Sequence, residues 1–317
     1  MRRVSTTVAA AVVVAVIGGA GGATPARAQT GDEPPAGDLS GYLERAAEAD
    51  YAGRRIVVTT WDGESEVGVF DVEHLGSMTR IAGSLMGEGK VSSGDAPGIA
   101  LESWSGPFAV DRYTTTPARD VLRLGRPARL VTVFEGDTVR ARFAFDLETW
   151  APLTTEVFDD AGELFRFAAF TEFAPDLDAD LYEELKTEGR AYDLMENVAA
   201  SDLPAEAGGY QRLDVYGADD GVIQAFYGDG LFSFSVFALG GDGDVVSPDG
   251  GRRLEIGDDT YVVTVNATDL WVQWQSGEGD YLLVGDLPPD HLERVLATLP
   301  GPRSSGLLSR VWDRLFG

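Results

Sequence analysis

The strongest constraint on the fold is a long series of short strand-like segments that falls into two groups. The first group spans residues 51–173 and the second spans residues 210–287. Each segment alternates apolar with polar residues or is rich in β-branched and aromatic residues, and Gly or Asp turns separate neighbouring segments. Strands that follow one another through such short turns pair antiparallel. We therefore predict an α+β protein with two antiparallel sheets and few helices.

The first group follows an expected helix with Ser40 as N-cap and Tyr42, Leu43, Ala46 and Ala47 on one apolar face. Its expected strands are "YAGRRIVVTTW" (51–61), "SEVGVFDVEHL" (65–75), "MTRIAGSL" (78–85), "ARLVTVFEG" (128–136), "TVRARFAFDL" (138–147), "PLTTEVFDD" (152–160) and "ELFRFAAFTEF" (163–173). Turn residues at 134–138 and 159–163 predict two hairpins. The stretch 88–98, rich in Gly and Ser, predicts a loop.

The second group is centred on an apolar run, "LFSFSVFAL" (231–239), interrupted only by Ser233 and Ser235. Because the apolar residues occupy both alternating positions, this strand is predicted to be buried on both faces. Pro289 then starts a helix with one apolar face. The other expected strands are "YQRLDVYGA" (210–218), "VIQAFYGDG" (222–230), "RRLEIGDD" (252–259), "TYVVTVNA" (260–267), "LWVQWQS" (270–276) and "DYLLVGDL" (280–287).

The N-terminal residues are typical of a secretory signal peptide. Arg2 and Arg3 are positive, Val8 to Val16 is apolar, and small residues precede an expected cleavage site after Ala28. We expect an exported, soluble protein in the periplasm or another extracytoplasmic space. The predicted organisation is a signal peptide (1–28), a disordered leader (29–39), a first domain (40–175), a linker helix (176–200), a second domain (201–300) and an amphipathic tail (301–317).

Composition excludes several classes of function. The formal net charge of −27 makes binding to nucleic acid improbable, because the phosphate backbone is itself anionic. The chain has no cysteine, which excludes disulfides, thiol catalysis and zinc–thiolate sites.

Few residues have the pattern of a catalytic or metal site. The two histidines, His74 and His291, are interpreted as structural, with His291 on the exposed side of the last helix. The acidic run that starts at Asp176 has the spacing of a calcium loop, but Leu181 stands where such a loop requires Gly, so we interpret it as a helix N-terminus. No nucleophile elbow or phosphate-binding loop occurs in the sequence. We predict a binding protein and not an enzyme, with no cofactor and no metal.

Several segments resemble the RseB/MucB family of periplasmic regulators. "AFYGDGLFSFSVFAL" (225–239) resembles the family's "DGL-x-x-x-SVF" strand. "LPAEAGGYQRL" (203–213) resembles its "LP-x-GF" segment, and "YLLVGDLPPDHLERVLATL" (281–299) resembles its "VVGE-x-P" strand and closing helix. The hairpin at 143–173 is also similar, although Thr149-Trp150-Ala151 replaces the family's "TGL" turn. "YAGR" (51–54) and "ARDVLRLG" (118–125) resemble the family's "Y-x-G" start and "RE-x-x-R" segment. The matching segments occur in the family's order over most of the chain.

The resemblance implies a first domain like the LolA and LolB lipoprotein carriers, a half-open antiparallel barrel with covering helices, and a smaller domain of one sheet and a helix. It further implies an extracytoplasmic negative regulator of a sigma-factor stress response. Such a protein binds the extracytoplasmic part of a membrane anti-sigma factor and shields it from proteolysis until a lipid-type signal arrives. The alternative function is a LolA-type carrier of lipids or lipoproteins.

Two sets of residues are candidate binding sites. Alternating apolar residues on adjoining strands are expected to line a cavity for a lipid or partner, or alternatively to pack against the helices. The cavity set comprises Phe143, Phe145, Leu153, Val157, Phe165 and Phe167.

The other candidate is the tail "GLLSRVWDRLFG" (306–317), where Arg310, Trp312 and Arg314 give an apolar and locally cationic helix. It is predicted either to make peripheral contact with a membrane surface or the anti-sigma partner, or to dock on its own domain.

Overall fold

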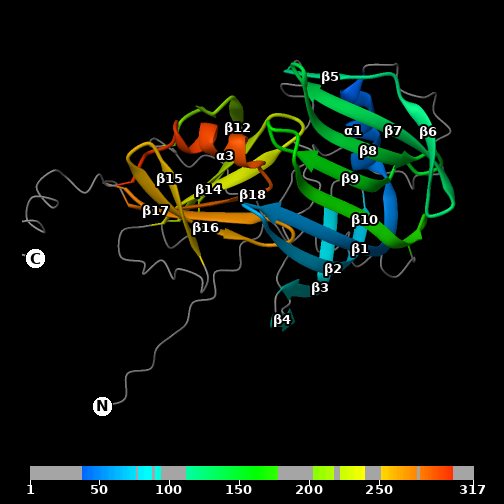
Figure 1. Ribbon diagram of the computed structural model, residues 1–317, viewed down its shortest axis with the longest axis horizontal. Coiled ribbons are helices and arrows are strands. Elements are labelled where there is room, and N and C mark those ends of the chain that lie inside the picture. Colours follow the sequence, from blue (N-terminus) through cyan, green and yellow to red (C-terminus); the bar gives the residue numbers. More distant parts are fainter. Residues whose placement is uncertain are drawn as a thin grey trace, which may run out of the picture.

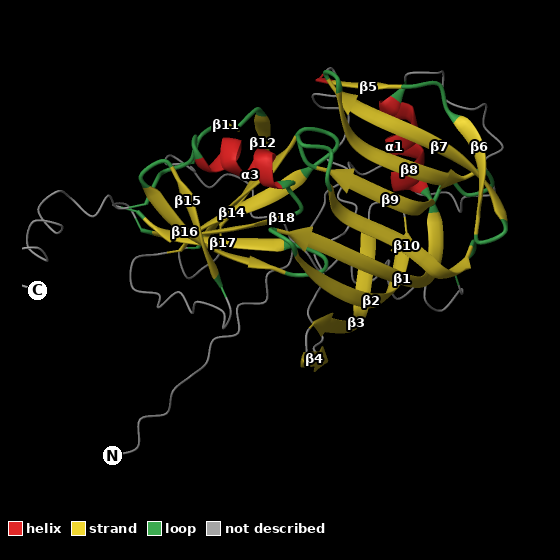
Figure 2. Cartoon of the chain, in the orientation of Figure 1, coloured by secondary structure: helices red, strands yellow, loops and turns green. Residues whose placement is uncertain are grey.

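Two antiparallel sheets lie side by side, each with one helix against it (Figure 1). The computed structural model describes residues 38–75, 78–87, 90–93, 112–177, 203–217, 222–239, 251–276 and 279–302. Strands and turns account for most of these residues (Figure 2). The predicted α+β class with two antiparallel sheets is confirmed.

The first sheet has ten strands in the order β4-β3-β2-β1-β10-β9-β8-β7-β5, and β6 pairs with β7. Its strands are β1 (Asp50–Trp61), β2 (Glu64–Leu75), β3 (Met78–Gly87), β4 (Lys90–Ser93), β5 (Tyr113–Thr115), β6 (Arg119–Arg123), β7 (Arg126–Glu135), β8 (Thr138–Asp146), β9 (Pro152–Phe158) and β10 (Leu164–Ala174). The expected hairpins at 134–138 and 159–163 are present as the β7–β8 and β9–β10 turns. The expected loop at 88–98 is wrong at β4, which pairs with β3.

Helix α1 (Leu39–Glu48) packs on the first sheet through one apolar face. Tyr42 stacks on Phe145 of β8 with ring centroids 5.6 Å apart, and it also contacts Trp150. The expected N-cap, Ser40, is wrong by two residues: the Asp38 side chain accepts a hydrogen bond from the Gly41 N–H at 2.9 Å. Asp and Ser cap equally well, so the sequence alone did not distinguish them.

The second sheet has eight strands in the order β11-β12-β13-β14-β18-β17-β16-β15. Its strands are β11 (Glu206–Ala207), β12 (Tyr210–Gly217), β13 (Ile223–Gly228), β14 (Ser233–Leu239), β15 (Arg252–Ile256), β16 (Asp259–Val265), β17 (Leu270–Gln275) and β18 (Asp280–Gly285). As predicted, β14 is buried on both faces: Phe234 and Val236 join one apolar cluster, and Phe237 joins another. Ser233 and Ser235 are also buried, and Ser235 Oγ accepts a hydrogen bond from Gln224 at 2.9 Å.

Helix α3 (Pro289–Leu296) covers the second sheet with the predicted apolar face, including Leu292, Val295 and Leu296. One cluster of buried side chains runs from α1 and the first sheet through to α3. Among its links, the Tyr113 ring meets the edge of Phe232, with ring centroids 6.4 Å apart. The two sheets therefore share a hydrophobic core. Nearly all of the expected linker helix (176–200) lies outside the described residues, so the domain limits stay a prediction.

Candidate functional site

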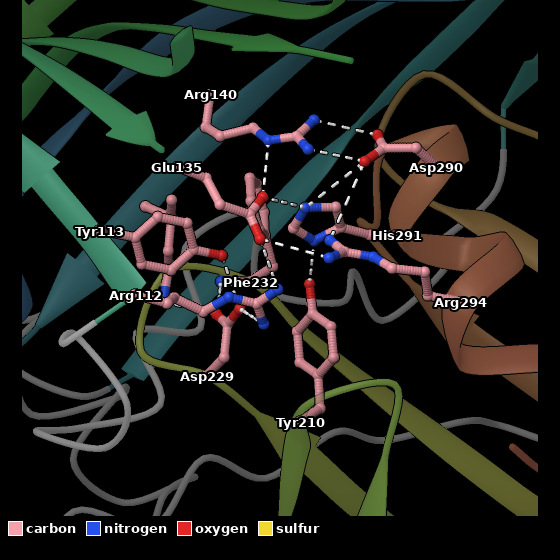
Figure 3. A network of polar contacts seen from close by, with 11 residues as sticks. Arg112, Tyr113, Glu135, Arg140, Tyr210, Asp229, Phe232, Asp290, His291 and Arg294 are labelled. Carbon is pink, nitrogen blue, oxygen red and sulfur yellow. Dashed lines mark hydrogen bonds and ion pairs between the residues drawn. The ribbon is translucent and has the colours of Figure 1, made fainter. Parts of the chain in front are cut away.

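A buried polar network joins the two sheets where β7 and β8 meet α3 and the β13–β14 turn (Figure 3). We call it the interface network, and it consists of Arg112, Tyr113, Glu135 and Arg140 from the first sheet and Tyr210, Asp229, Asp290, His291 and Arg294 from the second unit. It contains the largest group of ionisable side chains that the described parts of the two units bring together.

Asp229 forms the second unit's side of one half of the interface network. It follows β13, and its Oδ1 accepts the backbone N–H groups of Leu231 at 3.0 Å and Phe232 at 2.9 Å, which shapes the turn into β14. Its Oδ2 accepts the Tyr113 hydroxyl at 2.6 Å and Arg112 Nη1 at 3.1 Å. The Asp229 side chain is fully buried, so these four donors replace the water that a carboxylate would otherwise bind.

Glu135 is the last residue of β7 and is the acceptor at the centre of the other half of the interface network. Its carboxylate accepts hydrogen bonds from Arg112 at 2.6 Å, Arg140 at 2.8 Å and, more weakly, Arg294 at 3.3 Å. Burial alone would raise the pKa of Glu135, but hydrogen bonds from His291 and Arg112 lower it well below its usual range. Glu135 is therefore ionised, and it holds side chains from both units.

His291 lies at the centre of the interface network and is fully buried, so the expectation of an exposed His291 is wrong. Its Nε2 is 3.0 Å from Glu135 Oε2, and its Nδ1 is 2.5 Å from the Tyr210 hydroxyl. Burial lowers the pKa of His291 and raises that of Tyr210, so both side chains are neutral near pH 7. An ionised Glu135 can only accept, so His291 donates from Nε2 and accepts the Tyr210 hydroxyl at Nδ1.

Arg140 and Asp290 form the outer contact of the interface network. Two guanidinium nitrogens of Arg140 donate to the two carboxylate oxygens of Asp290, at 3.1 Å and 2.8 Å. This bidentate geometry fixes orientation as well as distance. Asp290 lies in the first turn of α3, where the helix dipole also favours a negative charge. The start of α3 is thereby held against β8.

A tyrosine, a histidine and a carboxylate in one hydrogen-bonded row can serve as a proton relay in catalysis. Here Tyr210 and His291 are both fully buried, and Phe232 meets the His291 ring edge-on with centroids 5.3 Å apart. A solvent-borne substrate cannot reach the tyrosine oxygen. The arrangement can join two units and respond to protonation, but it offers no exposed nucleophile. Among the described residues, no cluster of side chains has the composition of a metal site.

A second polar contact joins the units at the end of β1. The Thr59 hydroxyl donates to the Ala267 carbonyl at 2.7 Å and accepts from Arg166 Nε at 3.0 Å. Burial lowers the pKa of Arg166, which faces the charges of Asp269 and Asp286 across the interface. Burial in turn raises the pKa of Asp286 to about 6. A third contact joins β15 to the turn between β1 and β2, where Arg252 donates to the Trp61 carbonyl at 3.4 Å and forms an ion pair with Glu64. Polar contacts thus join the described parts of the two units at three separate places.

The expected cavity set divides in the structure. Phe143 pairs with Thr155, which lies next to Val157 on the same face of β9, and Phe143 and Val157 belong to one buried cluster. Leu153 lies at a register shift between β8 and β9 and belongs to a second buried cluster. Phe143 stacks on Phe145 at 5.4 Å, which in turn stacks under α1, so these rings pack against a helix as in the alternative expectation.

The other two members of the cavity set lie in β10, and Phe165 belongs to the same buried cluster as Phe143. Phe165 lies at a register shift in β10, is 2 % exposed, and meets Trp61 edge-on. Phe167 pairs with Glu156, which is next to Val157 in β9, and so lies on the opposite face of the sheet. Its place among the cavity residues was wrong, because the register shift changes which face the residues of β10 occupy. A lipid cavity stays a prediction. The tail residues Arg310, Trp312 and Arg314 lie outside the described residues.

Trp150 has an unusual backbone conformation at the position where the resembled family has Gly. Its φ is 65°, in the left-handed region that favours glycine. The indole is 7 % exposed and packs against Tyr42, and the Arg45 guanidinium lies 4.9 Å from its centroid. The backbone of Trp150 is thus in a conformation that Gly, the residue of the "TGL" turn, adopts without strain.

Sequence reasoning missed the interface network, including Glu135 and Arg140. Its one available signal was Asp229, the Asp of the "DGL" motif, which is an acidic residue two positions before the apolar run at 231–239. No local pattern shows that the partners of Asp229 come from residues 112 and 113, more than a hundred positions earlier.

Comparisons with known proteins give structural matches only. No family model matches the chain, and no curated protein matches it. Among solved structures, a crystal structure of MucB is 18% identical, covers 81% of this chain and 94% of its own, and has a TM-score of 0.44. MucB in complex with MucA(peri) is 20% identical, covers 84% of this chain and 100% of its own, and has a TM-score of 0.43. The Pseudomonas aeruginosa MucA/MucB complex has the same identity and coverages and a TM-score of 0.42.

In the part of the chain that the structure describes, no helix has the length and apolar character needed to cross a bilayer.

Proposed function

We propose that the protein is an extracytoplasmic regulator that binds the external segment of a membrane anti-sigma factor and controls its exposure to proteolysis. The observation that carries this proposal is the ordered set of RseB/MucB-like motifs along the chain. Their positions within the fold support it further. The "DGL" motif supplies Asp229, the "LP-x-GF" segment supplies Tyr210, and the closing-helix motif supplies Asp290 and His291. Three motifs therefore form the second unit's side of the interface network.

The nature of the interface network also supports a binding role. A regulator that responds to a signal needs two parts whose mutual placement can change, held by contacts that a ligand or a protonation can weaken. Buried ion pairs suit this role, because they give orientation more than net stability. The turn at Trp150 has a left-handed backbone, which favours Gly, and this supports the resemblance to the "TGL" turn at a position where the sequence departs from it.

The direct experiment measures binding between the mature chain and the external segment of a membrane anti-sigma factor encoded beside a sigma-factor gene in the same genome. We expect a dissociation constant below about 10 μM by titration calorimetry. The control is the external segment of an unrelated single-span membrane protein of similar charge, which should not bind. Absence of binding to every such neighbouring anti-sigma segment contradicts the proposal.

A further inference from the structure

The β6–β7 hairpin exposes apolar side chains at its tip. Leu122 is 68% exposed and Leu124 is 47% exposed, and in the described residues only Leu164 joins them as a large apolar side chain that is this exposed. Leu122 pairs across the hairpin with Pro127, which is also exposed. We call residues 121–127 the hairpin tip. Its leucines cover no core, unlike the neighbouring Val121, which packs against buried residues of the sheet.

Leu124 is kept at the tip although its backbone is strained. Its φ is 50°, and the following Gly125 has φ 73°. Two successive left-handed residues define the tight turn that favours Asn-Gly or Gly-Gly. A leucine in this conformation costs folding free energy that Gly or Asn would avoid, and here no buried contact offsets it. A strained, exposed apolar residue is an observation that points to an external partner.

Arginines lie within the hairpin tip and on both sides of it. Four arginines and one aspartate lie between residues 119 and 129 in a chain of net charge −27. Arg126 and Arg129 are ion-paired within the first sheet. Arg119 and Arg123 form no ion pair with any described residue, and Arg123 donates only to the Leu122 carbonyl. The tip therefore combines exposed leucines with unneutralised positive charge.

We propose that the hairpin tip docks on an anionic phospholipid surface. The leucines and Pro127 would enter the boundary between headgroups and acyl chains, and Arg119 and Arg123 would contact the phosphates. The two arginines are four positions apart along the strand, about 13 Å, so Arg119 reaches the outer headgroups when Arg123 lies at the boundary. A convex tip suits a deformable bilayer, whereas recognition of a peptide uses a groove or a sheet edge. The hairpin lies at the end of the first sheet away from the second unit (Figure 1), so docking leaves the interface network uncovered.

The overall charge of −27 shapes the expected affinity. Each arginine near an anionic surface contributes about a fivefold gain in partitioning, and the rest of the protein is repelled. At physiological salt the Debye length is about 8 Å, so the repulsion between distant acidic residues and the membrane is screened. The arginines at the tip lie closer to the phosphates than this length, so their attraction persists. Binding is therefore weak and reversible, and it is strongest at intermediate salt.

The experiment is co-sedimentation of the full mature chain with vesicles of phosphatidylglycerol and phosphatidylcholine, compared with phosphatidylcholine alone. We expect binding only to the anionic vesicles. The double variant Leu122→Ser/Leu124→Asn should lose about tenfold in partition coefficient, and Arg119→Gln/Arg123→Gln should lose at least as much. Leu164→Ser, which removes an exposed leucine elsewhere on the same sheet, should bind as the wild type does.

Several outcomes overturn the proposal. Wild-type protein that does not prefer anionic vesicles is one, and hairpin variants that bind as well as the wild type are another. Loss of binding in Arg310→Gln/Arg314→Gln, with the hairpin variants unaffected, assigns the contact to the tail instead. If the hairpin variants bind vesicles as the wild type does but bind the anti-sigma segment more weakly, the hairpin contacts a protein and not a membrane. None of these outcomes depends on the proposed regulatory function, which is tested by the anti-sigma titration.

Discussion

At the residue scale, Asp229 and His291 show why the interface network must form as a whole. Each is fully buried, and each has partners from the other sheet. A buried carboxylate without donors, or a buried imidazole without an acceptor, costs more free energy than the pair gains. Single substitutions in the interface network should therefore be far more damaging than substitutions in surface ion pairs.

Asp229→Ala tests this contrast. It leaves the Arg112 guanidinium, the Tyr113 hydroxyl and two backbone N–H groups without their acceptor, and the free energy of unfolding should fall by about 3–5 kcal/mol. The matched control is Asp71→Ala, which breaks the exposed ion pair with Arg54 (2.9 Å) and should leave the urea midpoint unchanged. Equal effects of the two substitutions would show that the interface network does not stabilise the fold.

His291 predicts a specific pH dependence. Its pKa in the folded protein lies below the ordinary value of 6.5, so the unfolded chain binds the proton more tightly. The His291 contribution to stability is therefore complete above pH 6.5 and decreases as the pH falls below it. The groups that face His291 are Tyr210, Glu135, Asp290 and Arg294.

Other groups titrate in the same range, so the effect must be measured as a difference. Asp286, whose pKa is raised to about 6, has the opposite sign: protonation of Asp286 favours the folded state as the pH falls below 6. The stability difference between wild type and His291→Gln should shrink from pH 7.5 to pH 5. A difference that stays constant or grows over that range contradicts a lowered pKa for His291.

At the element scale, local patterns predicted most strands and failed where one unit covers the other. The run at 231–239 was correctly predicted as doubly buried, because its alternation leaves no polar face. The burial of His291 was not predicted. This residue lies on the turn of α3 that contacts Glu135, and the periodicity of a helix carries no information about a contact with another sheet. The face of Phe167 was wrong for a related reason: a register shift in β10 has no signature in its alternation.

The turn of the β6–β7 hairpin gives an element-scale prediction. Leu124→Gly relieves a left-handed leucine and removes no buried contact, so the free energy of unfolding should change by less than about 1 kcal/mol in either direction and membrane binding should fall. Urea unfolding and vesicle co-sedimentation of the same variant check both parts. A loss of several kcal/mol would mean that the leucine has a packing role within the protein.

At the scale of the whole molecule, one hydrophobic cluster and three polar contacts unite the sheets. The order of the motifs predicted two units, but only the three-dimensional structure shows how strongly they depend on each other. We still expect a fragment of residues 201–300 to melt cooperatively, with a midpoint below that of the full chain because Asp229 and His291 lose their partners. Circular dichroism of the fragment and the full chain measures both midpoints, and a fragment without a cooperative transition contradicts an independent second domain.

The most direct test of the regulatory account is a proteolysis assay on the anti-sigma partner. The external segment of the neighbouring anti-sigma factor is incubated with its processing protease, with and without an excess of the mature chain. The account predicts that cleavage slows in proportion to the fraction of segment bound, and that Asp229→Ala weakens this protection beyond any loss of folded protein. Cleavage at the same rate in the presence of saturating, folded protein would contradict it.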